Sequence, residues 1–561
     1  MKKRTFYFDF LRFTALLCLT FSVAQTLAQP CTNVKDAPFL AKGDGVTDDT
    51  EAIRKAFAVA TNCVFFPKGI YVINPDSIRH MAIVRSGMTV RGEKNLSVLK
   101  LKDGGVMLQK SPLGNLLEQM LLGQELVFLP NGTPVINPLN NIVIKDLIFD
   151  ANYRGNRAEI NKVVSETRAL SFEKVTGLAI QNCVFVNAGK ACLVFVTCAN
   201  TVVSDNYFYD VGQGKFNADA IQGNGCFNTK ISGNVLENVG EGIFCQHHAA
   251  LLANKNVGTP DSLSEISNNR ISTLDVGEPA SIGTYISLAT LKSMQLQSIL
   301  LYDRAGRAIG PGIGVLSNNS KVFQNKILRH NGIAVQAFKL HGNLPTSNVE
   351  VRDNLIKENA KVKYFNCDQG QYIRNTNGAL VVSAEGQTVK NVQMRNNRVE
   401  TSFNCGIDLV IAQKDIQGSV FPGVLEDITI ENNTLNNTCK DTLIDKNAAV
   451  DFRNVGFTSP GNQNRFRNIT IRKNQLGYGY KGHGLWLEPC MANVRVLQNT
   501  FVGDLAFKFN AASGSCIREI APLTEFTTAQ KNFLQCFLEP GASAIGTCPP
   551  NQLPNRCKQC E

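Results

Sequence analysis

The sequence predicts an all-β protein, a single right-handed parallel β-helix (a solenoid) with an N-terminal capping helix. Runs of alternating β-branched residues recur along the chain, and each run ends in asparagine. Where no insertion intervenes, successive asparagines lie 206 − 182 = 24, 234 − 206 = 28 and 499 − 474 = 25 residues apart. This period, built from strands and turns without helices, is typical of solenoid coils.

The asparagines mark one position in every coil. They are Asn182, Asn206, Asn234, Asn269, Asn325, Asn354, Asn397, Asn433, Asn474 and Asn499. We expect each of them to take a turn conformation that most residues resist, and their amides to hydrogen-bond from coil to coil. A leucine-rich solenoid is the alternative, but its spaced leucine pattern is missing.

The first 28 residues have the pattern of an export signal. A basic start, Lys2 to Arg4, precedes the apolar run 14–24, and small residues follow as cleavage positions. Asp9 and Arg12 leave too short an apolar stretch for a membrane span, and no later segment is long enough. We therefore expect a secreted or periplasmic protein without a membrane span.

The capping helix is predicted directly after the signal and its linker. Thr47 is a suitable N-cap, and acidic residues at 48, 49 and 51 favour the first helical turn. The expected apolar face consists of Ile53, Ala56, Phe57 and Ala60. The acidic residues also permit a metal site, but helix capping explains them more simply.

The cysteines favour disulfides at the two ends of the solenoid. Seventeen are present, and loss of Cys18 with the signal leaves 17 − 1 = 16, an even number. Cys31 and Cys63 bracket the first unit of a β-helix domain expected over 29–515. A cysteine-rich tail or cap follows at 516–561, with Cys516, Cys536, Cys548, Cys557 and Cys560. The last two have zinc-ligand spacing, but no partner pair lies near, so no metal is predicted.

The net charge favours an anionic partner. The formal charge is +11, and removal of four basic residues and one acidic residue with the signal leaves 11 − 4 + 1 = +8. For a secreted protein, a uronic-acid or sulfated glycan fits this balance. No basic run interleaved with aromatic residues points to nucleic acid, and a monomer is expected.

A second strand phrase supplies the residues of a potential functional face. It reads Gly242-Ile-Phe-Cys-Gln246, Gly406-Ile-Asp-Leu-Val410 and Gly484-Leu-Trp-Leu-Glu488 in three of the coils. The apolar residue after glycine is expected to point inward and the next residue outward, so that outward residues of successive coils form columns. The long insertion between Ser281 and Gly310 is expected to form a helix or hairpin that walls this face.

The chain resembles the pectate-lyase-like superfamily, which includes polygalacturonases and related glycan hydrolases and lyases. The resemblance rests on Gly43-Asp-Gly-Val-Thr-Asp-Asp-Thr-Glu-Ala-Ile53, on Pro67-Lys-Gly-Ile-Tyr71 and on the asparagine-anchored coils. It extends to about residue 515 and implies a parallel β-helix that acts on a glycan. Asn217-Ala-Asp219 resembles the Asn-Thr-Asp element of polygalacturonases, and Gly240-Glu241 resembles their acidic pair. Their Arg-Ile-Lys element is missing from this chain.

Two candidate sites remain open. Glycosidic cleavage uses two carboxyl groups, about 5–5.5 Å apart for retention and about 6.5–9.5 Å apart for inversion. The first site has Asp219 and Glu241 as catalytic residues, with Gln246, His247 and His248 binding substrate. Its alternative interpretation is that both acids only complete turns.

The second candidate site lies further along the chain. Its catalytic carboxyl groups are Asp408, Asp451 and Glu488, and its substrate-binding residues are Arg453 and Trp486. Trp486 is the one tryptophan of the sequence and suits stacking against a sugar ring, while Arg453 suits a substrate carboxylate. The alternative interpretation is a solvated salt-bridge surface.

We therefore expect a secreted polysaccharide-degrading enzyme, a glycoside hydrolase or polysaccharide lyase, that acts on an acidic glycan. Hydrolysis is favoured over elimination because paired acids are easier to find than a calcium site. No cofactor is expected, apart from calcium if the enzyme is a lyase. The alternatives are a noncatalytic glycan-binding β-helix surface protein and a uronate epimerase on the same scaffold.

Overall fold

The computed structural model describes most of the chain after the predicted signal. It describes residues 30–546 except 75–79, 104–118, 124, 129–133, 153–167, 190, 213–218, 250–257, 276–277, 295–309, 339–343, 362–363, 367–370, 374–377, 413–422, 441–447, 456–464, 480–481, 488–490, 504–508, 512–516, 525, 539–541 and 545. The predicted signal peptide, Glu488 and Cys516, Cys548, Cys557 and Cys560 lie outside the described residues.

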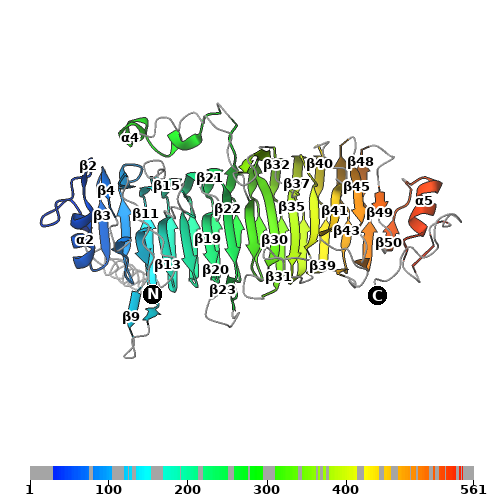
Figure 1. Ribbon diagram of the computed structural model, residues 1–561, viewed down its shortest axis with the longest axis horizontal. Coiled ribbons are helices and arrows are strands. Elements are labelled where there is room, and N and C mark those ends of the chain that lie inside the picture. Colours follow the sequence, from blue (N-terminus) through cyan, green and yellow to red (C-terminus); the bar gives the residue numbers. More distant parts are fainter. Residues whose placement is uncertain are drawn as a thin grey trace, which may run out of the picture.

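Three long parallel sheets wrap around one core and confirm the right-handed parallel β-helix (Figure 1). Each coil passes from sheet A to sheet B to sheet C, and the next coil pairs with it in register. Sheet A consists of β1 (Thr32–Asn33), β3 (Cys63–Phe66), β6 (Thr89–Gly92), β11 (Leu139–Lys145), β14 (Val175–Gln181), β17 (Ala199–Ser204), β20 (Phe227–Ser232), β25 (Glu265–Ser267), β28 (Lys321–Phe323), β31 (Thr346–Arg352), β36 (Thr388–Arg395), β39 (Val424–Glu431), β42 (Phe466–Arg467), β43 (Thr470–Arg472), β46 (Met491–Ala492), β47 (Val494–Leu497) and β50 (Ile517–Ala521).

Sheets B and C complete the coils. Sheet B consists of β2 (Asp44–Asp48), β4 (Gly69–Ile73), β7 (Ser97–Leu101), β12 (Ile148–Asp150), β15 (Val184–Ala188), β18 (Tyr207–Val211), β21 (Val235–Val239), β26 (Arg270–Ser272), β29 (Lys326–Leu328), β32 (Leu355–Asn359), β37 (Arg398–Ser402), β40 (Thr434–Thr438), β44 (Gln475–Tyr478) and β48 (Thr500–Val502). Sheet C consists of β5 (His80–Ile83), β8 (Gln119–Gly123), β13 (Arg168–Glu173), β16 (Leu193–Val196), β19 (Asp219–Asn224), β22 (Glu241–Gln246), β27 (Pro311–Leu316), β30 (Asn331–Phe338), β35 (Leu380–Glu385), β38 (Ile407–Ala412), β41 (Ala448–Val455), β45 (His483–Leu487) and β49 (Phe509–Ala511).

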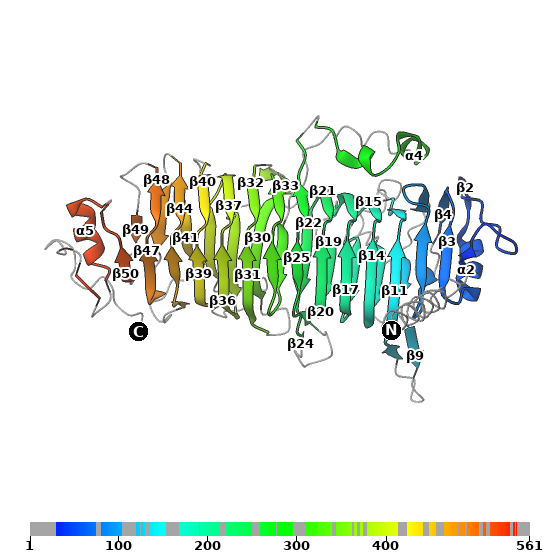
Figure 2. The same ribbon diagram turned by 180° about the vertical axis from the view of Figure 1, so that it is seen from behind.

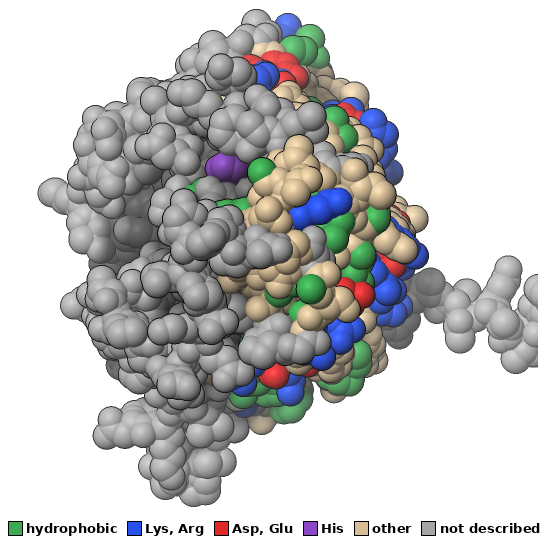
Figure 3. Space-filling model, turned by 90° about the vertical axis from the view of Figure 1, so that its right-hand side faces the viewer, with side chains coloured by type: hydrophobic (Ala, Val, Ile, Leu, Met, Phe, Trp, Pro, Cys, Tyr) green, Lys and Arg blue, Asp and Glu red, His purple; other side chains and the backbone are tan. Residues whose placement is uncertain are grey.

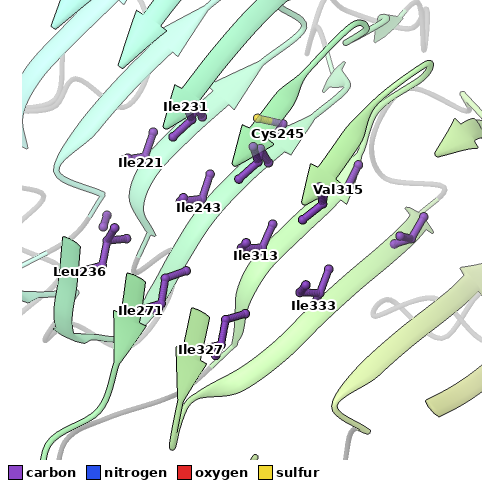
Figure 4. Close-up of a cluster of buried hydrophobic side chains, with 14 of the residues drawn as sticks. Ile221, Ile231, Leu236, Ile243, Cys245, Ile271, Ile313, Val315, Ile327 and Ile333 are labelled. Carbon is purple, nitrogen blue, oxygen red and sulfur yellow. The ribbon is translucent and has the colours of Figure 1, made fainter. Parts of the chain in front are cut away.

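The core is a stack of aliphatic side chains that repeats from coil to coil. On sheet C, Ile221, Ile243, Ile313 and Ile333 pair in register and are buried (Figure 4). Since side chains alternate along a strand, the residue after each of these isoleucines points outward. The predicted inward and outward assignment therefore holds for these strands of sheet C.

A continuous asparagine ladder joins the coils at the corner between sheets A and B. Each amide Nδ2 donates to the Oδ1 of the asparagine in the next coil, at distances near 3.0 Å. Its members are Asn206, Asn234, Asn269, Asn325, Asn354, Asn397, Asn433, Asn474 and Asn499. The predicted hydrogen bonding from coil to coil is thus present.

Two details of the ladder differ from the prediction. The residue that takes the left-handed conformation precedes the ladder asparagine, as Asp205 (φ 58°) does before Asn206. Asn182 occupies this left-handed position (φ 51°), and Cys183, whose N–H donates to Asn206 Oδ1, stands at the ladder position. The ladder asparagine instead turns its amide into the corner, where it satisfies backbone carbonyl groups of the neighbouring coil.

The N-terminal end carries α2 (Thr50–Val59), which Figure 1 shows at the end of the solenoid. The helix begins two residues later than predicted, with Asp49 rather than Thr47 as its N-cap residue. The Asp49 carboxylate accepts from Lys42 N and Gly43 N, so it holds the preceding loop. A disulfide joins Cys31 to Cys63 here, at an end where disulfides were expected.

At the C-terminal end, sheet A continues beyond residue 515 through β50, which pairs with β47. α5 (Thr528–Gln535) follows at the end of the solenoid (Figure 1), and Thr527 and Gln530 form a capping box at its start. Cys536, directly after α5, is disulfide-bonded.

The long insertion packs on sheet B rather than over sheet C. Its described part contains a short 3-10 helix, η2 (Ser281–Thr284), and α4 (Leu288–Ser293), which lie above the sheet B strands between β4 and β21 (Figure 2). Tyr285 stacks on Tyr207 of β18 with ring centroids 4.0 Å apart. Glu237 of β21 accepts from Ser281 N and Oγ and from Tyr207 Oη. The expectation that this segment walls the functional face is therefore wrong for its described residues.

Three short antiparallel pairs project from the coils. They are β9 (Glu125–Phe128) with β10 (Pro134–Asn137), β23 (His248–Ala249) with β24 (Gly258–Thr259), and β33 (Tyr364–Asn366) with β34 (Gln371–Ile373). Within the described residues, no helix is both long and apolar enough to cross a bilayer.

Candidate functional site

Both predicted clusters of site residues lie on sheet C, in strands that pair in register. Asp219 pairs with Glu241, and Asp408 pairs with Asp451, which in turn pairs with Trp486. Neighbouring strands lie about 4.8 Å apart. Parallel register therefore brings together residues that are 22 to 43 positions apart in the sequence.

The upstream cluster is centred on Asp219 and Glu241, at the corner where the chain enters sheet C. Asp219 is 3% exposed, whereas Glu241 is partly exposed. The Glu241 side chain lies against Gly310, where a Cβ atom would collide with its carboxylate. Asn331 Nδ2 donates to Gly310 O at 3.0 Å and so holds this backbone segment in place. The two carboxyl groups therefore have different environments on adjacent strands.

An outward aromatic ring further along β22 was missed by the sequence analysis. Phe244 points outward from β22, is partly exposed, and lies over Gly314 of the neighbouring strand, where a Cβ atom would collide with the ring. A ring lying flat on the sheet surface is a suitable platform for a sugar face. The signal in the sequence is the glycine that follows Ile313, at the position where other coils carry a larger outward residue.

Amide side chains extend the upstream cluster. Gln246 Nε2 donates to Asn224 Oδ1 at 2.7 Å, and both side chains are partly exposed. Gln222 is buried beside them, directly in register with Phe244. Gln246, predicted as a substrate-binding residue, thus belongs to a preformed polar row on sheet C.

His247 is not exposed at the surface, as its predicted substrate-binding role would require. It is buried, its Nδ1 accepts from Asp261 N at 2.9 Å, and its Nε2 lies 3.2 Å from Pro345 O. Both ring nitrogens therefore contact backbone atoms at the corner between sheets C and A, and His247 holds the backbone in position there. His248 begins β23, and its side chain lies outside the described residues.

The downstream cluster is organised by an ion pair. Arg453 Nε donates to Asp408 Oδ1 at 2.8 Å, and Arg453 Nη2 contacts Asp408 Oδ2, so both carboxylate oxygens face one guanidinium. Asp408 is 0% exposed, and the Arg453 side chain is 28% exposed. Asp408 therefore orients Arg453, and its burial rules out a solvated salt bridge at this position, while its predicted catalytic role stays a prediction.

Asp451 lies below the surface of the same cluster. It is 1% exposed, its Oδ2 accepts from Cys405 Sγ at 3.4 Å, and it lies 4.0 Å from Arg453 Nε. Burial raises the pKa of the Cys405 thiol well above its usual value, and the Asp451 charge raises it further. Trp486 is partly exposed, and the His483 ring lies 5.1 Å from its ring.

A calcium ion would need a cluster of acidic oxygen ligands near one of the two sites. Among the described residues, no group of three or more His, Cys, Asp or Glu side chains is arranged to hold a metal ion.

Comparisons with known proteins bear on the fold. Residues 31–258 match the family model described as "Rhamnogalacturonase A/epimerase, pectate lyase-like". The matched segment contains Asp219 and Glu241 and ends before the downstream cluster. The predicted resemblance to the pectate-lyase-like superfamily of parallel β-helices is thereby confirmed.

Solved structures match the chain at low sequence identity. A family 28 exopolygalacturonase from Yersinia enterocolitica matches with a TM-score of 0.50 and 13% identity, over 88% of this chain and 79% of that chain. The surface adhesin PfbA of Streptococcus pneumoniae matches with a TM-score of 0.46 and 14% identity, over 84% and 92%. The A-module of the mannuronan C-5 epimerase AlgE4 of Azotobacter vinelandii matches with 0.45 and 12%, over 86% and 97%. No curated protein sequence matches the chain.

Proposed function

We propose that this chain is a secreted or periplasmic enzyme that cleaves an acidic polysaccharide, with Asp219 and Glu241 as its catalytic carboxyl groups. The observation that carries the proposal is the in-register pairing of these two residues on β19 and β22. Pairing places their Cα atoms about 4.8 Å apart. Side chains that leave adjacent strands at this spacing can bring their carboxyl groups to either side of a glycosidic bond.

The upstream acids are favoured over the downstream acids for a physical reason. Both oxygens of Asp408 are engaged by Arg453, so a proton transfer by Asp408 would first break a buried ion pair. Glu241, in contrast, is partly exposed. The family match supports a carbohydrate substrate, and it covers the upstream acids but not Asp408 or Asp451.

The proposed reaction is hydrolysis. One carboxyl group would protonate the leaving oxygen while the other acts as nucleophile or activates water. Phe244 would support the sugar ring, and the Gln246–Asn224 pair would hydrogen-bond its hydroxyl groups. Elimination and epimerisation are the competing outcomes on this scaffold, and calcium belongs to the proposal only for elimination.

An acidic substrate is favoured by charge. After loss of the signal, the chain carries a formal charge of +8. Figure 3 shows lysine and arginine side chains spread along the described rim of the surface, with acidic side chains among them. A spread positive charge attracts a polyanion over distance rather than fixing it at one point.

The test is cleavage of acidic glycans by Asp219→Asn and Glu241→Gln. General acid–base catalysis contributes about 10²- to 10⁴-fold to rate, so each variant should lose at least that order of kcat. Reducing-end release measures hydrolysis, and absorbance at 235 nm measures elimination. Glu265→Gln on sheet A is the matched control, which should keep wild-type activity and melting temperature.

Two results would contradict the proposal. Full activity of both acid variants would remove Asp219 and Glu241 from the mechanism. No cleavage of any acidic glycan by the wild-type protein, with glycan binding intact, would favour the noncatalytic glycan-binding protein.

A further inference from the structure

The downstream cluster is the second place on sheet C where an aromatic side chain and charged groups meet at the surface. Trp486 is partly exposed and pairs in register with Asp451, and Arg453 follows Asp451 two positions along β41. The proposed catalytic pair does not use these residues. Their chemistry can therefore be considered independently of the cleavage step.

Arg453 is preorganised for ligand binding. Two of its nitrogens, Nε and Nη2, face the buried Asp408 carboxylate, which fixes the plane of the guanidinium. Among the described residues, no hydrogen bond to Arg453 Nη1 is present, and 28% of the side chain is exposed. A guanidinium held at one edge presents its remaining N–H groups in a fixed direction, which lowers the entropy cost of binding.

The charge balance argues against a carboxylate ligand. One guanidinium faces two carboxylates, because Asp408 pairs with Arg453 and Asp451 lies 4.0 Å from its Nε. A uronate brought to this point would meet the second carboxylate and gain little from an arginine that is already paired. A neutral pyranose meets no such repulsion, since its hydroxyl groups bond to Arg453 and one ring face stacks on Trp486.

The position of the cluster relates it to the proposed catalytic pair. From β22 to β41 the chain order in sheet C is β27, β30, β35, β38 and then β41, which is five strand spacings or about 24 Å. The outward residues between Phe244 and Asp408 are short: Gly314, Ala334 and Val381. All three of these residues are buried.

We propose that Arg453 and Trp486, with Asp408 as the residue that positions Arg453, form a binding subsite for a neutral sugar unit. The part that this subsite would play in cleavage rests on the proposed function, because the subsite would hold a distant unit of the polysaccharide that is cleaved. It then selects substrates that carry neutral sugars besides uronates. Its affinity for neutral sugars, however, requires no cleavage.

The experiment measures binding in a background that cannot cleave. The Glu241→Gln protein is run by affinity electrophoresis through xylan, arabinogalactan, polygalacturonate and alginate, of which the first two are largely neutral. At least one of the first two should retard it, and Trp486→Ala should weaken that retardation about tenfold. Trp486→Phe should restore most of it, while Asp408→Asn should weaken it by disordering Arg453.

Phe323→Ala is the matched control, because Phe323 is an outward aromatic on sheet A that lies against Arg352. It should leave all four retardations unchanged. Absence of retardation by both xylan and arabinogalactan would overturn the subsite. Equal losses on polygalacturonate and alginate with Trp486→Ala would also overturn it, because the subsite would then not distinguish neutral sugars.

The two proposals fail separately. A wild-type protein that cleaves nothing, but binds a neutral glycan through Trp486, would remove the catalytic proposal and keep the subsite. If cleavage depends on Asp219 and Glu241 but glycan binding does not change in Trp486→Ala, the catalytic proposal is kept and the subsite is removed.

Discussion

Replacement of Asp261 by asparagine should flatten the dependence of stability on pH. Asp261 lies buried in the corner between sheets C and A, where its Oδ2 accepts from Cys226 N at 2.9 Å and its Oδ1 accepts from Ser264 Oγ at 2.8 Å. Burial outweighs these hydrogen bonds and raises the pKa of the carboxyl group from 3.8 to about 7.

The direction of the effect follows from proton binding. Between pH 4 and pH 7 the unfolded chain has lost the Asp261 proton, whereas the folded chain keeps it. The free energy of unfolding therefore falls as pH rises through this window and levels off above pH 7. A shift of about three units at 1.36 kcal/mol each gives a loss of about 4 kcal/mol, as an upper value.

The assay is urea unfolding of the wild-type protein and Asp261→Asn at several pH values from 4 to 8. Asparagine resembles the neutral carboxyl group and does not titrate, so the stability difference between the two proteins should change by several kcal/mol over this range. Asp353→Asn, which removes a partly exposed carboxylate paired with Arg352, is the control and should keep the wild-type slope. Parallel pH curves for wild type and Asp261→Asn would refute the reasoning.

Two further substitutions test the ladder and the aromatic platform. Asn354→Ala should lower the melting temperature markedly, because it leaves Val322 O and Asn325 N without their partner at about 1–3 kcal/mol each, whereas Asn348→Gly in an exposed asparagine pair should change it little. Gly314→Ala should displace the Phe244 ring and raise KM several-fold at unchanged circular dichroism. An unchanged KM would show that Phe244 does not contact the substrate.

The architecture could be predicted because each repeat contains residues that mark its strands and its turn. Alternating apolar residues fix which side chains face the core, and a ladder asparagine recurs in each coil from Asn206 to Asn499. The predicted position of the left-handed turn residue was wrong by one residue. Two adjacent polar residues such as Asp205 and Asn206 do not show which of them takes a positive φ. At Asn182 the same ambiguity placed an asparagine where Cys183 stands.

For the candidate site, the sequence allowed a prediction of which residues pair in register, but not of how their side chains interact. The expected columns of outward residues on successive coils hold for Asp408, Asp451 and Trp486, which pair in register. The pairing of Arg453 with Asp408 depends on side-chain conformation across two strands, which alternation does not encode. His247 follows the end of β22, where alternation no longer determines direction, and it proved to be buried.

The asparagine ladder also governs where the chain tolerates new sequence. Because its amides tie every coil to the next at the corner between sheets A and B, turns at this corner have little freedom in length. Segments inserted before or after sheet C leave those amides untouched, as the excursion that carries α4 illustrates. Removing or duplicating one complete coil should therefore preserve the alignment of all others, which makes the spacing between the two clusters on sheet C adjustable in steps of one strand.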